Sequence, residues 1–267
     1  MRIGCATWLL GADKLLEAVR AACDAGLTAV SLNYAPIERL LPDELRELNH
    51  LMESHDLVAT LHTSVGLAGD EQWPWVLQFR LAWIREWHEQ TGRLACVTFD
   101  PGFIVDGEAR IFDVARSSAA LRSAAEVFAP LGVKVGIEYS HRCLNTVRLV
   151  TEFAEAANFP HVGQLLDLGH LNMCVHRGEC DATEFILNSP LEIVELHVHS
   201  NNGERDEHRP LDEGTLDLAP VVAALKTRGF DGIATLENLG FETGSEAAKA
   251  WRKCAAIFRE AWDGARL

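Results

Sequence analysis

Short apolar runs alternate along this chain with longer amphipathic stretches. Several of the runs are apolar at nearly every position, which is typical of strands covered on both faces of a parallel sheet. The runs predict eight strands, at Arg2–Thr7, Leu27–Leu32, Leu57–His62, Leu94–Phe99, Lys134–Tyr139, Gly163–Leu168, Ile193–Ser200 and Gly232–Glu237.

The stretches between these runs repeat apolar residues every three or four positions, which is the spacing of one helical face. Leu218, Val222 and Leu225, for example, share a face that ends before Gly229. Parallel strands need crossover connections, and right-handed crossovers repeated eight times can close into a barrel of roughly 250 residues. We therefore expect one α/β domain over residues 1–267, a (β/α)8 TIM barrel with its active site at the C-terminal ends of the strands.

An open, doubly wound sheet is the alternative architecture. Such sheets often bind nucleotides through a G-x-G-x-x-G turn or a P-loop after the first strand. Neither motif follows the strand predicted at Arg2–Thr7, so the sequence favours the barrel.

Charge and composition restrict the partners and the location. The chain has 39 acidic and 24 basic residues, and its net charge of −15 argues against nucleic acid as a partner. No apolar stretch approaches the roughly 20 residues that span a bilayer, and residues 1–10 lack the layout of a signal peptide. We expect a cytoplasmic protein without a membrane partner. The tryptophans at 73, 75, 83 and 87 fit either a homo-oligomer interface or the core, and the sequence leaves both open.

Four ionisable residues stand at the ends of the last four predicted strands: Glu138, Asp167, His199 and Glu237. In a closed parallel barrel these ends converge on one mouth. Buried charges are costly unless they are paired or bound to metal, and carboxylates and imidazole are common ligands of divalent ions. The set predicts a site for Mn²⁺, Mg²⁺, Co²⁺ or Zn²⁺. Ion pairs or solvated strand ends are the alternative interpretation.

The residues around these positions carry a family resemblance. The segments are Val135-Gly-Ile-Glu138-Tyr, Leu166-Asp167-Leu-Gly-His170, Leu196-His197-Val-His199-Ser-Asn-Asn-Gly203, Arg205-Asp206-Glu-His208-Arg-Pro-Leu-Asp-Glu-Gly214 and Thr235-Leu-Glu237-Asn. Together they resemble the xylose-isomerase-like TIM-barrel superfamily, which includes sugar isomerases, ketose 3-epimerases and endonuclease IV (AP endonuclease family 2). The resemblance spans most of the chain and is strongest from residue 134 onward.

The resemblance implies roles for particular residues. Glu138, Asp167, His199 and Glu237 would bind the metal, and Glu138 and Glu237 would also exchange the proton, as the matching glutamates do in the ketose epimerases. His170 would contact substrate, or a further metal in the nuclease branch. His197 points to the same side of its strand as His199, and we expect it to contact substrate or support the ligands; a satisfied core histidine is the alternative.

Other residues match parts of the endonuclease IV site. Asp206 and His208 resemble the D-x-H that supplies an extra metal-ligand pair there, so they are candidates for a second metal, with a solvated loop as the alternative. His62 closes the third predicted strand, where the nuclease also has a histidine. The segment Phe99-Asp100-Pro101-Gly102 resembles F-H-P-G but has Asp in place of the metal-binding His. This departure argues against a full three-metal nuclease site.

The remaining candidates would bind substrate. His62, His170, His197 and His208 offer polar contacts, and Arg205 could grip a carboxylate, phosphate or hydroxyl group. Trp8, at the end of the first predicted strand, could form an apolar wall against a sugar ring, although core packing explains it equally well.

These groups favour one chemistry over its alternatives. A metal that binds two sugar oxygens acidifies the proton next to the carbonyl, and two flanking carboxylates can remove and return that proton. We therefore expect a metal-dependent isomerase or epimerase of a small sugar, or of a sugar-derived keto acid, with no organic cofactor. The alternatives are an endonuclease IV-like phosphodiesterase acting on DNA and a barrel that binds a ligand without converting it.

Overall fold

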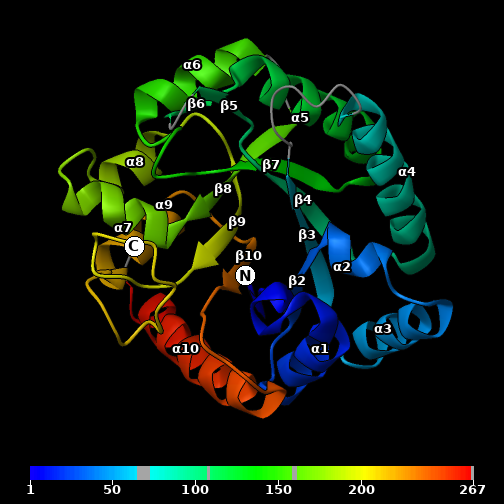
Figure 1. Ribbon diagram of the computed structural model, residues 1–267. Coiled ribbons are helices and arrows are strands. Elements are labelled where there is room, and N and C mark those ends of the chain that lie inside the picture. Colours follow the sequence, from blue (N-terminus) through cyan, green and yellow to red (C-terminus); the bar gives the residue numbers. More distant parts are fainter. Residues whose placement is uncertain (65–72, 107–108, 158–160, 266–267) are drawn as a thin grey trace.

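The computed structural model describes residues 1–64, 73–106, 109–157 and 161–265. Eight parallel strands stand around a common axis with the helices outside them (Figure 1). The strands are β1 (Arg2–Cys5), β2 (Ala29–Asn33), β3 (Val58–Ser64), β4 (Leu94–Asp100), β7 (Lys134–Glu138), β8 (Val162–Asp167), β9 (Ile193–Val198) and β10 (Ile233–Leu236). Each overlaps one of the predicted strands, and the predicted TIM barrel is confirmed.

The strand order is β1-β10-β9-β8-β7-β4-β3-β2. The two ends of this order, β1 and β2, meet at the bridge between Ala6 and Ser31, so the barrel is nearly closed. On the other side, Asp167 of β8 and Thr235 of β10 both pair in register with His197 of β9. This register brings the C-terminal ends of the last strands to one level at the mouth.

The outer layer consists of helices that follow the strands. They are α1 (Leu15–Asp24), α2 (Tyr34–Glu38), α3 (Pro42–Ser54), α4 (Trp73–Thr91), α5 (Val114–Phe128), α6 (Val147–Ala157), α7 (Leu168–His176), α8 (Ala182–Asn188), α9 (Leu218–Thr227) and α10 (Gly244–Gly264), with short 3-10 turns η1 (Thr7–Leu10), η2 (Ala12–Lys14) and η3 (Ala129–Leu131). Their apolar faces bury large side chains such as Phe128, Phe153 and Trp251 against the strands. This packing supplies most of the hydrophobic stabilisation of the barrel.

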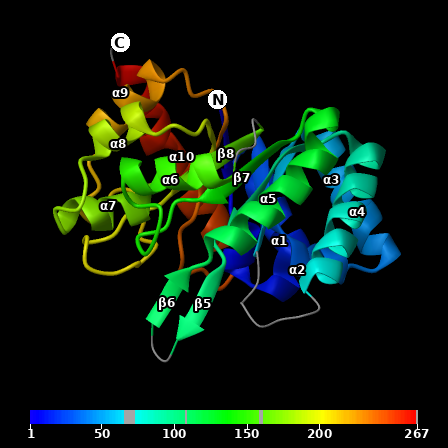
Figure 2. The same ribbon diagram turned by 90° about the horizontal axis from the view of Figure 1, so that it is seen from above.

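A two-stranded antiparallel hairpin, β5 (Phe103–Asp106) and β6 (Ala109–Phe112), lies between β4 and α5 and was not predicted. It projects away from the ring (Figure 2). Phe103 and Phe112 pack against the core, whereas their neighbours Ile104 and Ile111 are exposed. Strands of four residues are too short for periodicity to separate them from a loop.

The tryptophans of α4 divide between core and surface. Trp73 and Trp87 are buried, and Trp83 packs against the core. Trp75 is 81% exposed, and Phe79 one turn later is 61% exposed. Homo-oligomerisation stays a prediction. In the described part of the chain, no helix has both the length and the hydropathy of a bilayer-spanning segment.

Candidate metal centre

The four residues predicted as metal ligands meet at the mouth. Glu138 and Asp167 are the last residues of β7 and β8, and His199 and Glu237 directly follow β9 and β10. His199 Nε2 lies 3.1 Å from Asp167 Oδ1, and His197 Nδ1 lies 3.1 Å from Glu237 Oε2. All five side chains are buried. The convergence expected from the strand pattern is therefore present.

A cavity of about 290 Å³ opens at this mouth. It is lined by Trp8, Asn33, His62, Asp100, Glu138, Asp167, His170, His197, Asp206, His208 and Glu237. Two predicted site residues are outside this lining. His199 is fully buried behind it, with its ring stacked on that of His208 at 4.0 Å. Arg205 lies on the exposed surface of its loop, and its contact with substrate stays a prediction.

Asp167 and Gly169 shape the junction between β8 and α7. Asp167 is the N-cap of α7, and its Oδ1 accepts a hydrogen bond from His170 N at 2.6 Å. A Cβ atom on Gly169 would lie 1.9 Å from Cε1 of His199. The absence of a side chain at this position is what allows the His199 ring to reach Asp167.

The loop after β9 is held by side-chain hydrogen bonds. Asn201 donates to the carbonyl oxygen of Gly169 at 2.9 Å and accepts from Gly203 N at 2.8 Å. His208 has a φ of 49°, in the left-handed region, and its Nδ1 donates to the carbonyl oxygen of Glu237 at 2.9 Å. This bond orients the ring so that Nε2 faces Asp206, 3.3 Å away.

The donor set fits a divalent cation. The described residues contain three groups in which the ligand atoms of the members lie within 4.8 Å of one another. They are His199, His208 and Glu237; His62, Asp100 and Glu138; and Glu138, Asp167 and His197. Among the described lining residues there is no Lys or Arg to neutralise the acids. Among the described residues, neither ring nitrogen of His197 has a partner for a well-aligned hydrogen bond, although Nδ1 is close to Glu237. Buried carboxylates beside unpartnered imidazole nitrogens are suited to Mn²⁺, Co²⁺ or Zn²⁺.

His62 and Asp100 form a second side of the cavity. His62 Nε2 lies 3.1 Å from Asp100 Oδ1 and 3.6 Å from Glu138 Oε2. The Trp8 ring is stacked on the His62 ring, with centroids 5.7 Å apart, so Trp8 does line the cavity. Asn33, which also caps α2, was missed because it lies one residue beyond the predicted strand. A polar residue directly after an apolar run was the signal for it.

Comparison with known proteins identifies the family to which this barrel belongs. Residues 19–261 match the family described as xylose isomerase-like TIM barrel. The chain belongs to this family.

Two curated relatives of this xylose isomerase-like barrel align with part of it. The chain is 29% identical over 154 residues to the ketose 3-epimerase of Arthrobacter globiformis, which is 56% of this chain and 49% of the relative. It is 25% identical over 139 residues to an uncharacterised protein of Methanocaldococcus jannaschii, which is 51% of this chain and 47% of the relative. The matches thus span about half the length of these relatives.

Solved structures share the whole fold. The structure of D-psicose 3-epimerase with D-tagatose from Clostridium cellulolyticum H10 has a TM-score of 0.77, covering 98% of this chain and 99% of that one. The sequence identity is 15%, so this likeness concerns the fold of the xylose isomerase-like barrel.

The two glutamates of this xylose isomerase-like barrel have opposite pKa shifts. Burial, followed by the nearby Asp100, raises the pKa of Glu138 well above its usual range. Burial also opposes ionisation of Glu237, but His197 and His208 outweigh it and lower the pKa of Glu237. The two carboxyl groups of one cavity therefore favour opposite protonation states, which is the arrangement that acid–base catalysis uses.

The histidines around them favour the protonated form. Burial opposes the charge in each case, but Asp167 and Asp206 raise the pKa of His170 to about 10. Glu237 similarly raises the pKa of His197 to about 9, and Asp206 and Glu237 raise that of His208 to about 9. Protons on these imidazoles thus offset acidic charge that a divalent ion could offset instead.

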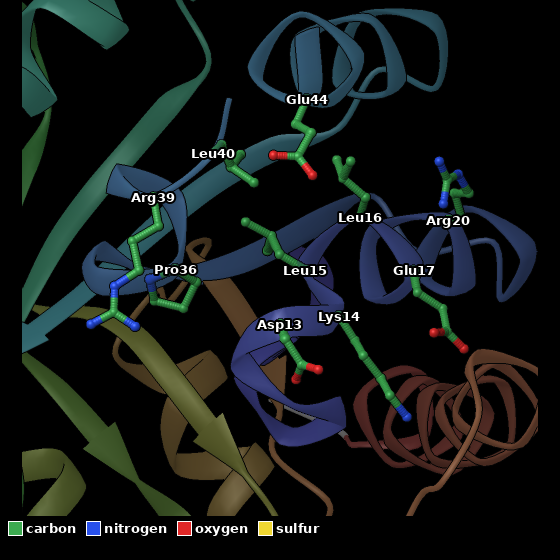
Figure 3. Close-up of a pocket in the computed structure, with 10 residues that line it drawn as sticks. All are labelled: Asp13, Lys14, Leu15, Leu16, Glu17, Arg20, Pro36, Arg39, Leu40 and Glu44. Atoms are coloured by element: carbon green, nitrogen blue, oxygen red, sulfur yellow. The ribbon is translucent and has the colours of Figure 1, made fainter. Parts of the chain in front are cut away.

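A larger cavity of about 580 Å³ lies outside the barrel, between α1, α2 and α3. Figure 3 shows acidic and basic side chains interleaved along it, including Asp13, Lys14, Glu17 and Arg39. The lining of this outer groove includes none of the candidate metal ligands.

Proposed function

We propose that this chain is a metal-dependent epimerase of an unphosphorylated ketose, with Glu138 and Glu237 as the proton-transfer pair. The observation that carries the proposal is that these two glutamates line one cavity together with Asp167 and four histidines, a donor set suited to a divalent ion. The likeness to the Arthrobacter globiformis ketose 3-epimerase supports the substrate class.

The residues at the mouth would have two roles, metal binding and proton transfer. A divalent ion held by Glu138, Asp167, His199 and Glu237 would polarise the carbonyl and a neighbouring hydroxyl of the sugar and stabilise the charge that develops there. One of the two glutamates, as the carboxylate, removes the proton from the carbon next to the carbonyl, and the other, as the acid, returns a proton to the opposite face. Each glutamate takes the other role in the reverse direction.

The lining of the cavity supports a neutral substrate. Five acidic side chains line it, and no Lys or Arg does so among the described residues. A phosphate group would find no guanidinium or ammonium partner among them, whereas sugar hydroxyls can donate hydrogen bonds to the carboxylates and accept them from the imidazoles. Trp8, next to His62 and His197, offers an apolar face for the carbon skeleton.

The test uses Glu138→Gln and Glu237→Gln in the manganese-loaded protein. Each variant is incubated with a panel of ketohexoses in D2O, and deuterium at C3 of recovered substrate and product is measured by NMR. We expect loss of epimerisation in both variants with the thermal unfolding transition retained. Glu192→Gln, which alters only a surface pair with Lys134, is the control and should keep the wild-type rate. Wild-type turnover in both glutamate variants would show that the assigned proton carriers are wrong.

An endonuclease IV-like phosphodiesterase is the second candidate. The observation that favours it is the presence of three groups of ligand atoms and of a further pair, His170 Nε2 and Asp206 Oδ2, which lie 3.1 Å from each other, since such enzymes bind more than one metal. The acidic wall and the net charge of −15 oppose DNA binding. Cleavage of an abasic-site duplex by the metal-loaded protein, without epimerisation of any ketose, would replace the first proposal with this one.

A further inference from the structure

Two cysteine thiols meet at the C-terminal end of α7. Cys174 is in the last turn of this helix and is fully buried, whereas Cys180 lies just before α8 and is partly exposed. The two thiols form a hydrogen bond with each other. The hydroxyl of Tyr139 also contacts the pair, at 3.9 Å from Cys180 Sγ. Neither cysteine belongs to the three groups of candidate metal ligands.

The turn that ends α7 brings the two cysteines together. Gly178 has a φ of 70°, in the left-handed region that glycine adopts at low cost. The carbonyl oxygen of Cys174 accepts a hydrogen bond from Glu179 N at 2.9 Å, and that of Val175 accepts one from Gly178 N at 3.0 Å. These two bonds form a Schellman motif. They return the chain so that Cys180 lies beside the helix that carries Cys174.

The two thiols of this pair are not equivalent. The hydrogen bond with Cys174 lowers the pKa of Cys180, although burial and the acidic neighbours Glu179 and Asp181 oppose this effect. The same hydrogen bond, followed by burial, raises the pKa of Cys174. The shared proton is therefore on the buried sulfur, and the partly exposed sulfur has the thiolate character. The thiolate is the form of cysteine that peroxides oxidise.

The guanidinium of Arg177 stands beside the buried thiol. Its Nη2 donates to Cys174 Sγ at 3.3 Å and to the carbonyl oxygen of His141 at 3.2 Å. Its Nε donates to Glu179 Oε1 at 2.6 Å, so the group is held in place from more than one side. A positive charge at this distance favours the thiolate of Cys174 once Cys180 has lost its negative charge. The buried thiol is thus equipped to react second.

We propose that Cys180 and Cys174 are a site of reversible oxidation by a peroxide, with Cys180 as the attacking thiol and Cys174 as the resolving thiol. Accessible cysteines with thiolate character beside a second cysteine are typical of such sites. The proposal is independent of the reaction at the mouth of the barrel.

The oxidation takes place in two steps. The thiolate of Cys180 attacks one oxygen of hydrogen peroxide, the O–O bond breaks, and the other oxygen leaves as hydroxide, which takes a proton from the solvent. Cys180 is then a sulfenic acid. The sulfur of Cys174 attacks the sulfur of this acid, the S–O bond breaks, and the hydroxyl group leaves as water with the proton of Cys174. The two thiols become a disulfide, and the peroxide becomes water.

The test treats the reduced full-length protein with hydrogen peroxide, in the presence of a chelator so that bound metal forms no radicals. Trypsin cleaves after Arg177 and separates the two cysteines into the peptides 149–177 and 178–205, which contain no other cysteine. We expect mass spectrometry to find these two peptides linked, with the mass of two hydrogens lost. Dithiothreitol should separate them again.

Matched variants assign the two roles. Cys174→Ser should form the sulfenic acid and retain it, so that dimedone, a trap for sulfenic acids, labels Cys180. Cys180→Ser should form neither the linked peptides nor a dimedone adduct at Cys174. Cys23→Ser is the control, because Cys23 is also partly exposed but burial raises its pKa. This variant should form the linked peptides as the wild type does.

A measurement on the wild type decides the matter if Cys174→Ser, which alters a buried position, does not fold. Dimedone added together with the peroxide should compete with disulfide formation and label Cys180 but not Cys174. The absence of linked peptides in the wild type overturns the proposal. Oxidation of Cys23 as fast as that of Cys180, or a sulfenic acid at Cys174 in place of Cys180, overturns it as well.

Discussion

The three protonated histidines at the mouth predict that the chelator-treated protein loses stability as the pH rises. The pKa values of His170, His197 and His208 are raised to about 10, 9 and 9 in the folded protein, against about 6.5 in an unfolded chain. A pKa raised by folding contributes stability that is fully present below the unfolded pKa. That stability is lost as the pH rises through the folded pKa, so the affected window extends from about pH 6.5 to about pH 10.

The magnitude follows from the number of protons. Near pH 8 an unfolded imidazole is nearly neutral and each of these folded ones is protonated, so each contributes about 1.4 kcal/mol of lost stability per pH unit. Asp206 interacts with both His170 and His208, so the three contributions are not independent. We expect a total slope of about 1.4 to 4 kcal/mol per pH unit, which is large against the 5–15 kcal/mol of a typical domain.

The assay is chemical unfolding of chelator-treated protein at several pH values from about 7 to 9. His170→Gln should reduce the slope by about 1.4 kcal/mol per pH unit, whereas His50→Gln, on the exposed surface of α3, should leave it unchanged. A divalent ion that replaces these protons should flatten the slope, and its binding should release at least about one proton by calorimetry in different buffers. Equal stability across the range, together with metal binding that releases no proton, would refute the reasoning.

Three further outcomes are expected. Gly169→Ala should weaken manganese binding by displacing the His199 ring, and overpacking should cost about 1–3 kcal/mol of stability. Titration calorimetry measures the affinity and denaturant unfolding measures the stability. An unchanged affinity for manganese would contradict the close approach of Gly169 and His199. Phe185→Ala, which removes a fully buried ring packed edge-on against Tyr139 at 4.8 Å, should cost about 3–5 kcal/mol in urea unfolding. Manganese at 100 times its dissociation constant should stabilise the folded protein by about 2.7 kcal/mol, and a chelator should remove this gain; an unchanged melting temperature would count against a metal centre.

The fold and the meeting of the acids could be predicted because both depend on local pattern and on topology. Apolar runs placed Glu138, Asp167 and Glu237 at strand ends, and a closed parallel barrel brings such ends together. The apolar pattern could not predict which of His197 and His199 lines the cavity. Alternation along a strand puts both on one side, yet β9 ends at Val198, and His199 continues into a loop that turns it behind the cavity wall.

Charge states and long-range hydrogen bonds were also out of reach of the sequence. From the sequence, Asp100 was only the residue that replaces the histidine of the F-H-P-G segment. The structure shows that its Oδ1 lies 3.1 Å from His62 Nε2. Burial and Asp100 raise the pKa of Glu138, whereas His197 and then His208 lower that of Glu237. His208 belongs to a loop, and no apolar pattern indicates its left-handed backbone conformation.

The two walls of the mouth differ in how their strands are joined. The acids stand on β7, β8 and β10, within a run of strands paired residue by residue. Trp8 and Asn33 flank the junction of β1 and β2, which is joined at the bridge of Ala6 with Ser31. One wall of the mouth thus belongs to strands that pair over several residues, whereas the opposite wall flanks a junction that has a single bridge in the described part of the chain. We therefore expect the wall formed by Trp8 and Asn33 to shift more readily than the wall that carries the acids.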